Sequence, residues 1–358
     1  MHAYLLGRLW RLPWLDTPLA HRILVLGLAL LWLAYPLARV LERRGSTAIA
    51  HPIEWLGAAW LGALFLLVAC LLIADLLTGF GWWAPRLAPT ARTLAVIGGL
   101  GLSVIALVQG TRPPKVEEVT IVSPKLPATH DGLRLVQISD LHVGALLNSH
   151  WLQHVAAQVG ALAPDAVLIT GDLVDGNARR VAEVLPELRA FTAPLGVWAV
   201  SGNHEYYAGL ELSVDVLRQA GFRVLRDESA ELCPGVVVAG VDDLTARRQF
   251  GDTSDPFPNA LADRPVGFTV FLSHTPWRAE EAAAMGVDVM LSGHTHAGQI
   301  WPFGYLTGLQ YPYLEGRYAV GEMTLYVSRG TGTWGPRMRL PRPAEITVVT
   351  LRSDSSRR

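Results

Sequence analysis

The chain has 358 residues, of which 51% are hydrophobic and only 17% are charged, and its formal net charge is −1. Soluble domains carry about 25% charged residues, so this composition indicates membrane segments as well as a folded core. Because nucleic-acid-binding proteins usually carry an excess of basic residues and this chain is nearly neutral, no nucleic-acid partner is expected. The two cysteines, Cys70 and Cys233, lie far apart in the sequence, which argues against a disulfide framework and a zinc–thiolate site.

Three apolar runs, near residues 23–41, 55–77 and 93–108, precede residue 110. A helix needs about 20 apolar residues to cross a bilayer, with a range of roughly 17–25, so residues 1–110 are predicted to be an all-α transmembrane region. Buried core helices are the alternative for these runs, whereas a cleaved signal peptide has a single apolar stretch. Met1–Trp14 is typical of an interfacial helix or of the end of a further apolar helix.

Basic residues near the ends of the three runs are balanced, five on each side of the membrane. The positive-inside rule therefore gives no orientation. We expect a multi-pass membrane protein that contacts the lipid bilayer, with the side of its soluble part and its oligomeric state left open.

The rest of the chain alternates apolar strands with helices, which predicts an α/β domain. Residues 111–125 are assigned to a linker and first strand, 126–352 to the domain and 353–358 to a polar tail. The expected helices are His150–Leu162 and Val181–Phe191. The expected strands are Leu133–Ser139, Ala166–Thr170, Gly196–Val200, Gly267–Ser273, Val287–Ser292, Met323–Ser328 and Glu345–Leu351. Strands from two halves of the domain suggest two packed sheets with helices outside.

Polar side chains follow three successive strands of this pattern. Asp140, Asp172 and Asn203 are spaced by about the length of one βαβ unit, and ligands bind at the carboxyl edge of open α/β sheets. In Asp140-Leu141-His142 an extended backbone would point both polar side chains to one side. Gly171 permits a sharp turn before Asp172, and Asp175 is expected to support the loop rather than bind a metal.

Gly202-Asn203-His204-Glu205 supplies an amide oxygen next to an imidazole. The amide adds no negative charge beside an anionic substrate, and His204 can act as an acid near neutral pH. His274 follows another apolar strand, and His294-x-His296 repeats the spacing of two residues. A surface or core role is the ordinary alternative for each motif alone, but five motifs at strand ends point to one metal centre.

With these five blocks the sequence resembles the calcineurin-like metallophosphoesterase superfamily over about residues 115–352. It is similar to the bacterial membrane-anchored branch, including Ser328-Arg329-Gly330-Thr331-Gly332 and Glu345-Ile346-Thr347. Pro343-Ala344-Glu345 departs from that branch, where Pro directly precedes Glu. The resemblance implies a four-layer α/β/β/α sandwich and places the chain in the inner (cytoplasmic) membrane of a bacterium.

The resemblance also implies a ligand set for two metal ions that share Asp172. One ion would be held by Asp140, His142, Asp172 and His296. The other would be held by Asp172, Asn203, His274 and His294. Oxygen and imidazole donors without thiolate suit divalent or trivalent Mn, Fe or Zn rather than calcium, and His204 is the expected catalytic residue.

The implied reaction is hydrolysis of a phosphoester by metal-activated hydroxide. A membrane anchor raises the effective concentration of lipids, so we expect a lipid-linked phosphodiester or pyrophosphate of the UDP-2,3-diacylglucosamine type. The alternatives are a nucleotide or cyclic-nucleotide phosphodiesterase and an inactive membrane scaffold. Aromatic residues beside the ligand blocks either form an apolar cradle or pack the loops. They are Tyr206, Tyr207, Trp301, Phe303 and Tyr305.

Overall fold

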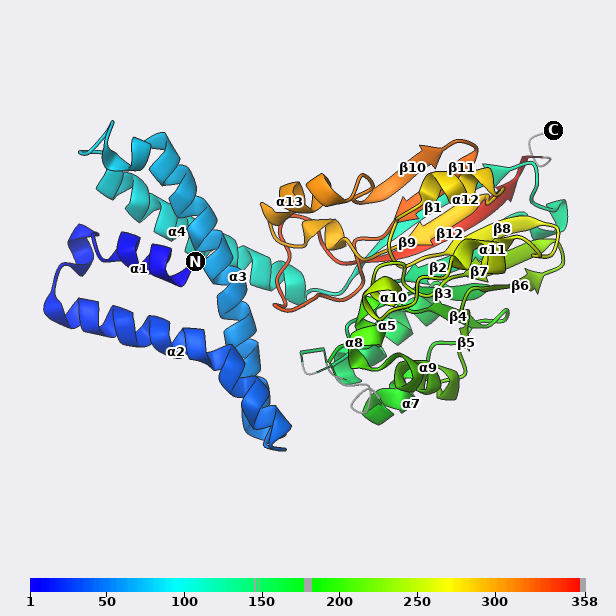
Figure 1. Cartoon of the computed structure of the whole chain (residues 1–358), viewed down its shortest axis with the longest axis horizontal. Coiled ribbons are helices and arrows are strands. Elements are labelled where there is room, and N and C mark those ends of the chain that lie inside the picture. The colour runs from blue at the N-terminus through cyan, green and yellow to red at the C-terminus, as the bar shows by residue number, and fades with distance from the viewer. Residues whose placement is uncertain (145, 148, 177–181, 355–358) are drawn as a thin grey trace. The chain divides into compact units, whose positions relative to one another are not determined.

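The computed structural model describes residues 1–144, 146–147, 149–176 and 182–354 (Figure 1). Contacts divide the chain into two units. The first contains Met1–Arg112 together with two short later segments, Ile300–Pro302 and Gly335–Pro341. The second contains Pro113–Gln299, Phe303–Trp334 and Arg342–Arg358.

The first unit consists of helices. They are α1 (His2–Leu9), α2 (Pro18–Arg43), α3 (Thr47–Leu77) and α4 (Ala88–Thr111). Three segments are long and apolar enough to cross a membrane, namely Pro18–Glu42, Ala48–Leu77 and Ala88–Thr111. Each extends beyond the predicted apolar run because a helix continues through the polar residues that flank the hydrocarbon layer.

A buried carboxylate joins three of these helices. Asp75 of α3 has no exposed side-chain surface and contacts Arg8 of α1 at 2.6 Å and Arg92 of α4 at 2.8 Å. The hydroxyl of Tyr4 donates a third hydrogen bond to it at 2.6 Å. Since an unpaired charge is costly at a buried site, these contacts fix α1 against the α3–α4 pair.

The two later segments of the first unit pack against α3 and α4. Ile300 and Met338 share a hydrophobic cluster with Leu66 and Ala106. The Arg339 amide donates to the Ala106 carbonyl at 2.9 Å.

The second unit contains two six-stranded sheets, ordered β1-β12-β2-β3-β4-β5 and β10-β11-β9-β8-β7-β6. The strands of the first sheet are β1 (Lys115–Ser123), β2 (Arg134–Ile138), β3 (Ala166–Thr170), β4 (Val197–Val200), β5 (Arg223–Val224) and β12 (Glu345–Ser353). Those of the second are β6 (Glu228–Cys233), β7 (Val236–Gly240), β8 (Phe268–Leu272), β9 (Val289–Ser292), β10 (Gly316–Val320) and β11 (Met323–Val327).

Three hydrophobic cores show that the layers are helix, sheet, sheet and helix. Successive strand residues face opposite sides, so Leu135 packs between the sheets whereas Val136 packs under α5 (Ser149–Ala161) and α9 (Leu210–Gln219). The third core lies between the second sheet and α11 (Pro256–Leu261) and α12 (Ala279–Ala284). The predicted four-layer α/β/β/α architecture, preceded by apolar helices, is confirmed.

One predicted helix is wrong in its extent. Within Val181–Phe191 the structure has a 3-10 turn, η4 (Ala182–Val184), and a short helix, α7 (Leu185–Leu188), while Val181 lies outside the described residues. Pro186 cannot donate a backbone hydrogen bond, so it begins a helical turn rather than continuing one.

Replacing Asp75 with Asn should destabilise the first unit. Arg8 and Arg92 would lose their counter-charge, a change that costs about 3–5 kcal/mol at a buried pair. We expect a clearly lower melting temperature for D75N in detergent micelles, followed by circular dichroism. Asp16→Asn, at an exposed position, is the control, and equal melting of the two variants would contradict this role.

Candidate metal centre

The predicted ligands follow the carboxyl ends of five strands. Strands β2, β3 and β4 are parallel neighbours in the first sheet, and β8 and β9 are parallel neighbours in the second. Parallel strands bring the residues after their carboxyl ends to one edge of a sheet. Asp140, Asp172 and Asn203 therefore gather on one side of the site, opposite His274 and the His294–His296 block.

The local backbone differs from the expected extended conformation. Asp140 and His142 have φ angles of 53° and 46°, and Asp172, His294 and His296 have 52°, 71° and 49°. The left-handed region costs a non-glycine residue about 1–2 kcal/mol. These side chains therefore meet because tight left-handed turns follow the strands, not because an extended strand alternates its faces.

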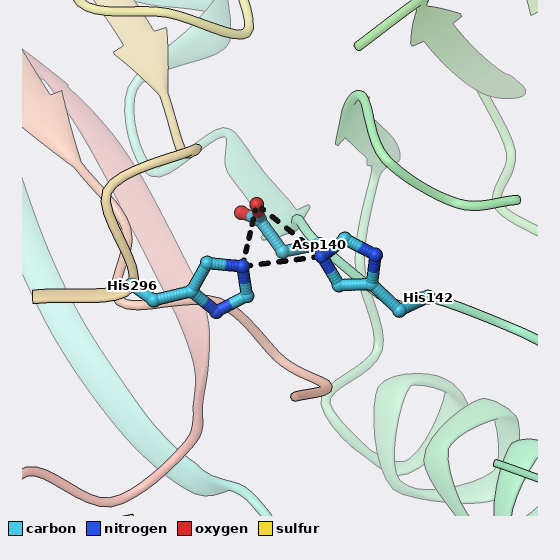
Figure 2. Close-up of side chains that lie close together, drawn as sticks. All are labelled: Asp140, His142 and His296. Carbon is cyan, nitrogen blue, oxygen red and sulfur yellow. Dashed lines mark hydrogen bonds and ion pairs between the residues drawn. The ribbon is translucent and has the colours of Figure 1, made fainter. Parts of the chain in front are cut away.

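The first group of side chains joins the two sheets. Asp140 Oδ1 lies 3.2 Å from His296 Nε2 and 4.0 Å from His142 Nε2. The two imidazole Nε2 atoms are 3.1 Å apart. Figure 2 shows the Asp140 carboxylate directed toward both rings, with His142 on the same segment as Asp140 and His296 on a different one.

The second group is built around Asp172. Its Oδ2 lies 3.1 Å from His274 Nε2, and His294 Nδ1 lies 3.2 Å from the same His274 nitrogen. Asp172 Oδ2 is also 3.8 Å from His142 Nε2 of the first group. Asp172 is therefore placed between the two groups, as a bridging ligand would be.

Other contacts set which atoms face the centre. His274 Nδ1 donates to the Thr170 carbonyl at 2.7 Å, which leaves Nε2 directed at Asp172. The His294 amide donates to Asp140 at 3.1 Å, and the His204 amide donates to Asp172 Oδ1 at 2.8 Å. One side of each carboxylate is thereby held, and the remaining lone pairs point into the site.

The donor set fits cations. Three clusters of close donor atoms can be drawn, Asp140–His142–His296, His142–Asp172–His204 and Asp172–His274–His294. Ring nitrogens of two histidine pairs lie 3.1–3.2 Å apart, close enough to share either a proton or a cation. Among the described residues, the buried Asn203 Oδ1 has no hydrogen-bond partner, which a metal ion would supply.

The titration behaviour of the cation-free chain agrees with this fit. Burial, reinforced by the positive His204, lowers the pKa of His142 to about 3. Burial and the nearby His274 lower the pKa of His294 to about 4. Both rings are therefore neutral at physiological pH, which is the form of imidazole that binds metals. Burial alone would lower the pKa of His274, but the adjacent Asp172 carboxylate raises it well above its ordinary value.

Glycines allow the ligand loops to approach one another. A Cβ on Gly293 would overlap Ser139 Oγ and Asp140 Oδ2. A Cβ on Gly202 would overlap Asp172 Oδ1. Close approach of the backbone is thus required at both positions.

The sequence reasoning gave no role to Glu205, which joins the two loops of the first sheet. Its buried carboxylate accepts the amides of Gly202 at 2.6 Å, Val174 at 2.8 Å and Asp172 at 3.0 Å. Burial and the charge of Asp172 raise the pKa of Glu205 to about 7. Its position three residues after the helix N-cap, where an acidic side chain reaches back to backbone amides, was the available sequence clue.

Three further contacts were also missed. Tyr311 Oη lies 2.7 Å from His294 Nε2, which orients the ring so that Nδ1 faces His274. Gly332 donates to the Asp140 carbonyl at 3.0 Å and Thr331 donates to the Ser139 carbonyl at 2.7 Å. These partners could not be assigned from the sequence, because each lies on a different loop from the residue that it contacts.

His204 stands at the edge of the centre. Its Nδ1 lies 3.0 Å from Asp175 Oδ1, so Asp175 supports an imidazole as well as its own loop. Burial would lower the pKa of His204, but Asp172 and Asp175 raise it to about 9 in the cation-free chain. Metal cations nearby would lower this pKa by repulsion.

The five aromatic residues singled out in the sequence have different surroundings. Tyr206 is buried and its ring lies 5.6 Å from Phe250, which is packing. Tyr207 is 52% exposed and its ring lies 5.5 Å from His204. Trp301 packs with the Leu66–Ala106 cluster, whereas Phe303 and Tyr305 are exposed. Trp334, which the sequence did not single out, lies 6.4 Å from the His204 ring.

Comparison with known proteins gives the family. Residues 133–298 match the model described as calcineurin-like phosphoesterase. An Aquifex aeolicus metallophosphoesterase is 37% identical over 246 residues, which cover 66% of this chain and 92% of that protein. The chain belongs to the calcineurin-like phosphoesterase family, and its second unit is of the metal-dependent phosphoester hydrolase class.

Two relatives from animals are named as transmembrane proteins. A Danio rerio protein named transmembrane protein with metallophosphoesterase domain is 37% identical over 273 residues, covering 72% of this chain and 62% of that protein. A Bos taurus protein of the same name is 33% identical over 282 residues, covering 73% and 62%. The chain thus spans about six-tenths of these two relatives, and the comparisons do not separate a bacterial from an animal branch.

Solved structures with a similar arrangement include the protein TT1561 of Thermus thermophilus, with a TM-score of 0.38, 14% identity and coverage of 56% of this chain and 90% of that one. A dimetal phosphatase from Danio rerio has a TM-score of 0.37 and 14% identity, covering 56% of this chain and 88% of that one.

Replacing Glu205 with Ala should reduce metal binding. Three buried amides would lose their acceptor, at about 1–3 kcal/mol each, and the Asp172 and Asn203 loops would separate. We expect metal affinity to fall about 10–100-fold, measured by elemental analysis after dialysis. Glu322→Ala, an exposed change, should retain the metals. Full metal content in E205A would show that the loops hold without this carboxylate.

Proposed function

We propose that this protein is a membrane-anchored two-metal phosphoesterase that hydrolyses a phosphodiester or a pyrophosphate. The observation that carries the proposal is the position of Asp172, which clusters with His274 and His294 on one side and approaches His142 of the Asp140–His142–His296 cluster on the other, beside His204. Asp140, His142 and His296 would hold one cation with Asp172. Asn203, His274 and His294 would hold the other with the same carboxylate.

Two such cations supply a water nucleophile at neutral pH and neutralise charge on the phosphoryl oxygens. The Mn, Fe or Zn assignment follows from the imidazole and oxygen donors. The residues of the chain keep these donors fixed, since the loops are held by buried contacts from Glu205 and from the Thr331–Gly332 segment.

His204 is the proton donor of this proposal. Its ring is held by Asp175 at 3.0 Å and is partly open to solvent, with 14% of its side chain exposed. A protonated imidazole there can give its proton to the leaving alkoxide or hydrogen-bond a phosphoryl oxygen. Asp175 stabilises the charged ring and sets its orientation.

The proposed substrate is lipid-linked. The proposed location is the bacterial inner membrane, and three candidate spans support a multi-pass protein. A tethered domain meets headgroups at high effective concentration. The names of the Danio rerio and Bos taurus relatives also put a metallophosphoesterase domain on a transmembrane protein. A UDP-2,3-diacylglucosamine-type pyrophosphate fits this class.

Nucleotide or cyclic-nucleotide hydrolysis is the second candidate. It is favoured by the exposed rings of Tyr207, Phe250 and Trp334, because bases stack on aromatic side chains. The complete ligand set, in turn, speaks against an inactive scaffold. Rates on a lipid pyrophosphate in mixed micelles and on a cyclic nucleotide in the same micelles would separate the two enzyme candidates.

His204→Ala should lower kcat on bis(4-nitrophenyl) phosphate about 10²–10⁴-fold while both metals stay bound. The ring lies outside the ligand assignment, so its loss removes a proton donor and leaves the donor atoms in place. Turnover and metal content are measured on the same preparation. Loss of the metals in H204A would overturn the assigned role, and absence of hydrolysis by the metal-loaded wild type on every phosphoester would overturn the proposed function.

Asp175→Asn should shift the pH profile. As an acid, His204 is active when protonated, and activity falls as pH rises through its pKa. Asp175 raises that pKa, so its neutralisation should move the basic limb of kcat/KM to lower pH. Asp215→Asn, an exposed change, should leave the limb in place. An unshifted limb in D175N would assign the titration to another group.

A further inference from the structure

Helix α13 (Phe303–Gln310) is apolar and has no buried residue. Its large side chains are exposed by 45% at Phe303, 73% at Tyr305, 57% at Leu306 and 85% at Leu309. No charged residue stands between Ile300 and Leu314. A surface helix in water normally turns its apolar side to a core and its polar side to solvent, and α13 does the opposite.

The helix has two distinct faces. At about 100° per residue the large side chains fall on one face, namely Phe303, Tyr305, Leu306 and Leu309. The other face carries Gly304, Thr307 and Gly308. Gly304 touches the ligand loop, since a Cβ on Gly298 would overlap the Gly304 backbone. Gly304 of the small face therefore packs on the ligand loop, and the large apolar face is left outward.

The residues just before α13 belong to the helical unit. Ile300 packs with Leu66 of α3 and Ala106 of α4, and Trp301 borders the same cluster. Both helices are candidate spans, and Ala106 lies near the end of α4. Only Pro302 separates this contact from the first residue of α13, so the helix starts within one residue of a segment that packs on candidate membrane helices.

We propose that α13 lies in the membrane interface, with Phe303, Tyr305, Leu306 and Leu309 inserted among lipid headgroups and upper acyl chains. Aromatic residues beside leucines and an uncharged helix suit this layer. The inference rests on the proposed bilayer anchoring and not on the proposed hydrolysis.

The placement of α13 would bring the metal centre to the lipid surface. The helix begins seven residues after His296, and Tyr311, the first residue after it, contacts the His294 ring at 2.7 Å. A helix anchored in the interface would thus hold both ligands of the His294–His296 loop close to a lipid phosphate.

The test labels the full chain in phosphatidylcholine nanodiscs. Leu309→Cys, in a background where Cys70 and Cys233 are Ala, carries an environment-sensitive fluorophore. We expect blue-shifted emission and quenching by lipids that carry a nitroxide near the headgroup. The matched control is Val266→Cys, an apolar position with 99% exposure between the charged Arg264 and the start of β8, whose label should stay water-like and unquenched.

Each outcome decides the proposal. A Leu309 label as water-like as the Val266 label would overturn it. A blue shift without lipid quenching would also overturn it, because a protein surface would then cover the helix. In a second variant, Leu306→Asp with Leu309→Asp should abolish the quenching of a label at Tyr305→Cys, whereas Val266→Asp should leave it unchanged. No turnover is measured, so failure of the proposed hydrolysis would not affect these results.

Discussion

The arrangement of the metal centre depends on one buried carboxylate. Glu205 accepts amides from Asp172, Val174 and Gly202, and so joins two loops that follow different strands. Buried amides without an acceptor are costly, and one carboxylate satisfies three of them. With these loops joined, Asp172 can face His142 and His274 together, and His204 is placed next to Asp175.

Strain and charge concentrate around this contact. Five proposed ligands have positive φ, and carboxylates and imidazoles crowd a largely buried site. Two cations would turn the repulsion between ring nitrogens into attraction to a shared centre, and so offset the cost of the backbone turns. The fold prepares this geometry because its two sheets present their carboxyl edges to the same point, with Asp140 from one and His296 from the other (Figure 2).

The membrane region and the hydrolytic domain are connected through more than the chain at Arg112. The helical unit includes Ile300–Pro302 and Gly335–Pro341. The residues on either side of each short segment belong to the second unit. His296 is four residues before the first segment, and Trp334 directly precedes the second. The chain segments next to these two short stretches therefore carry a proposed metal ligand, His296, and the ring of Trp334, which lies 6.4 Å from the His204 ring.

Sequence alone predicted the apolar helices and the α/β alternation, because hydropathy and strand period are local properties, and the family resemblance supplied the proposed ligand set. The sequence predicted Ala166–Thr170 as the strand observed as β3. The sequence prediction was wrong about the extent of the helix at Val181–Phe191, where the effect of Pro186 was overlooked. It also missed contacts between residues that are far apart in the sequence. Only the tertiary structure placed Asp140 against His296, Glu205 under two loops and Tyr311 on His294. The left-handed turns at the proposed ligands could not be predicted for the same reason. A strained backbone is held by contacts from segments that are remote in the sequence, and a short stretch of sequence does not reveal those contacts.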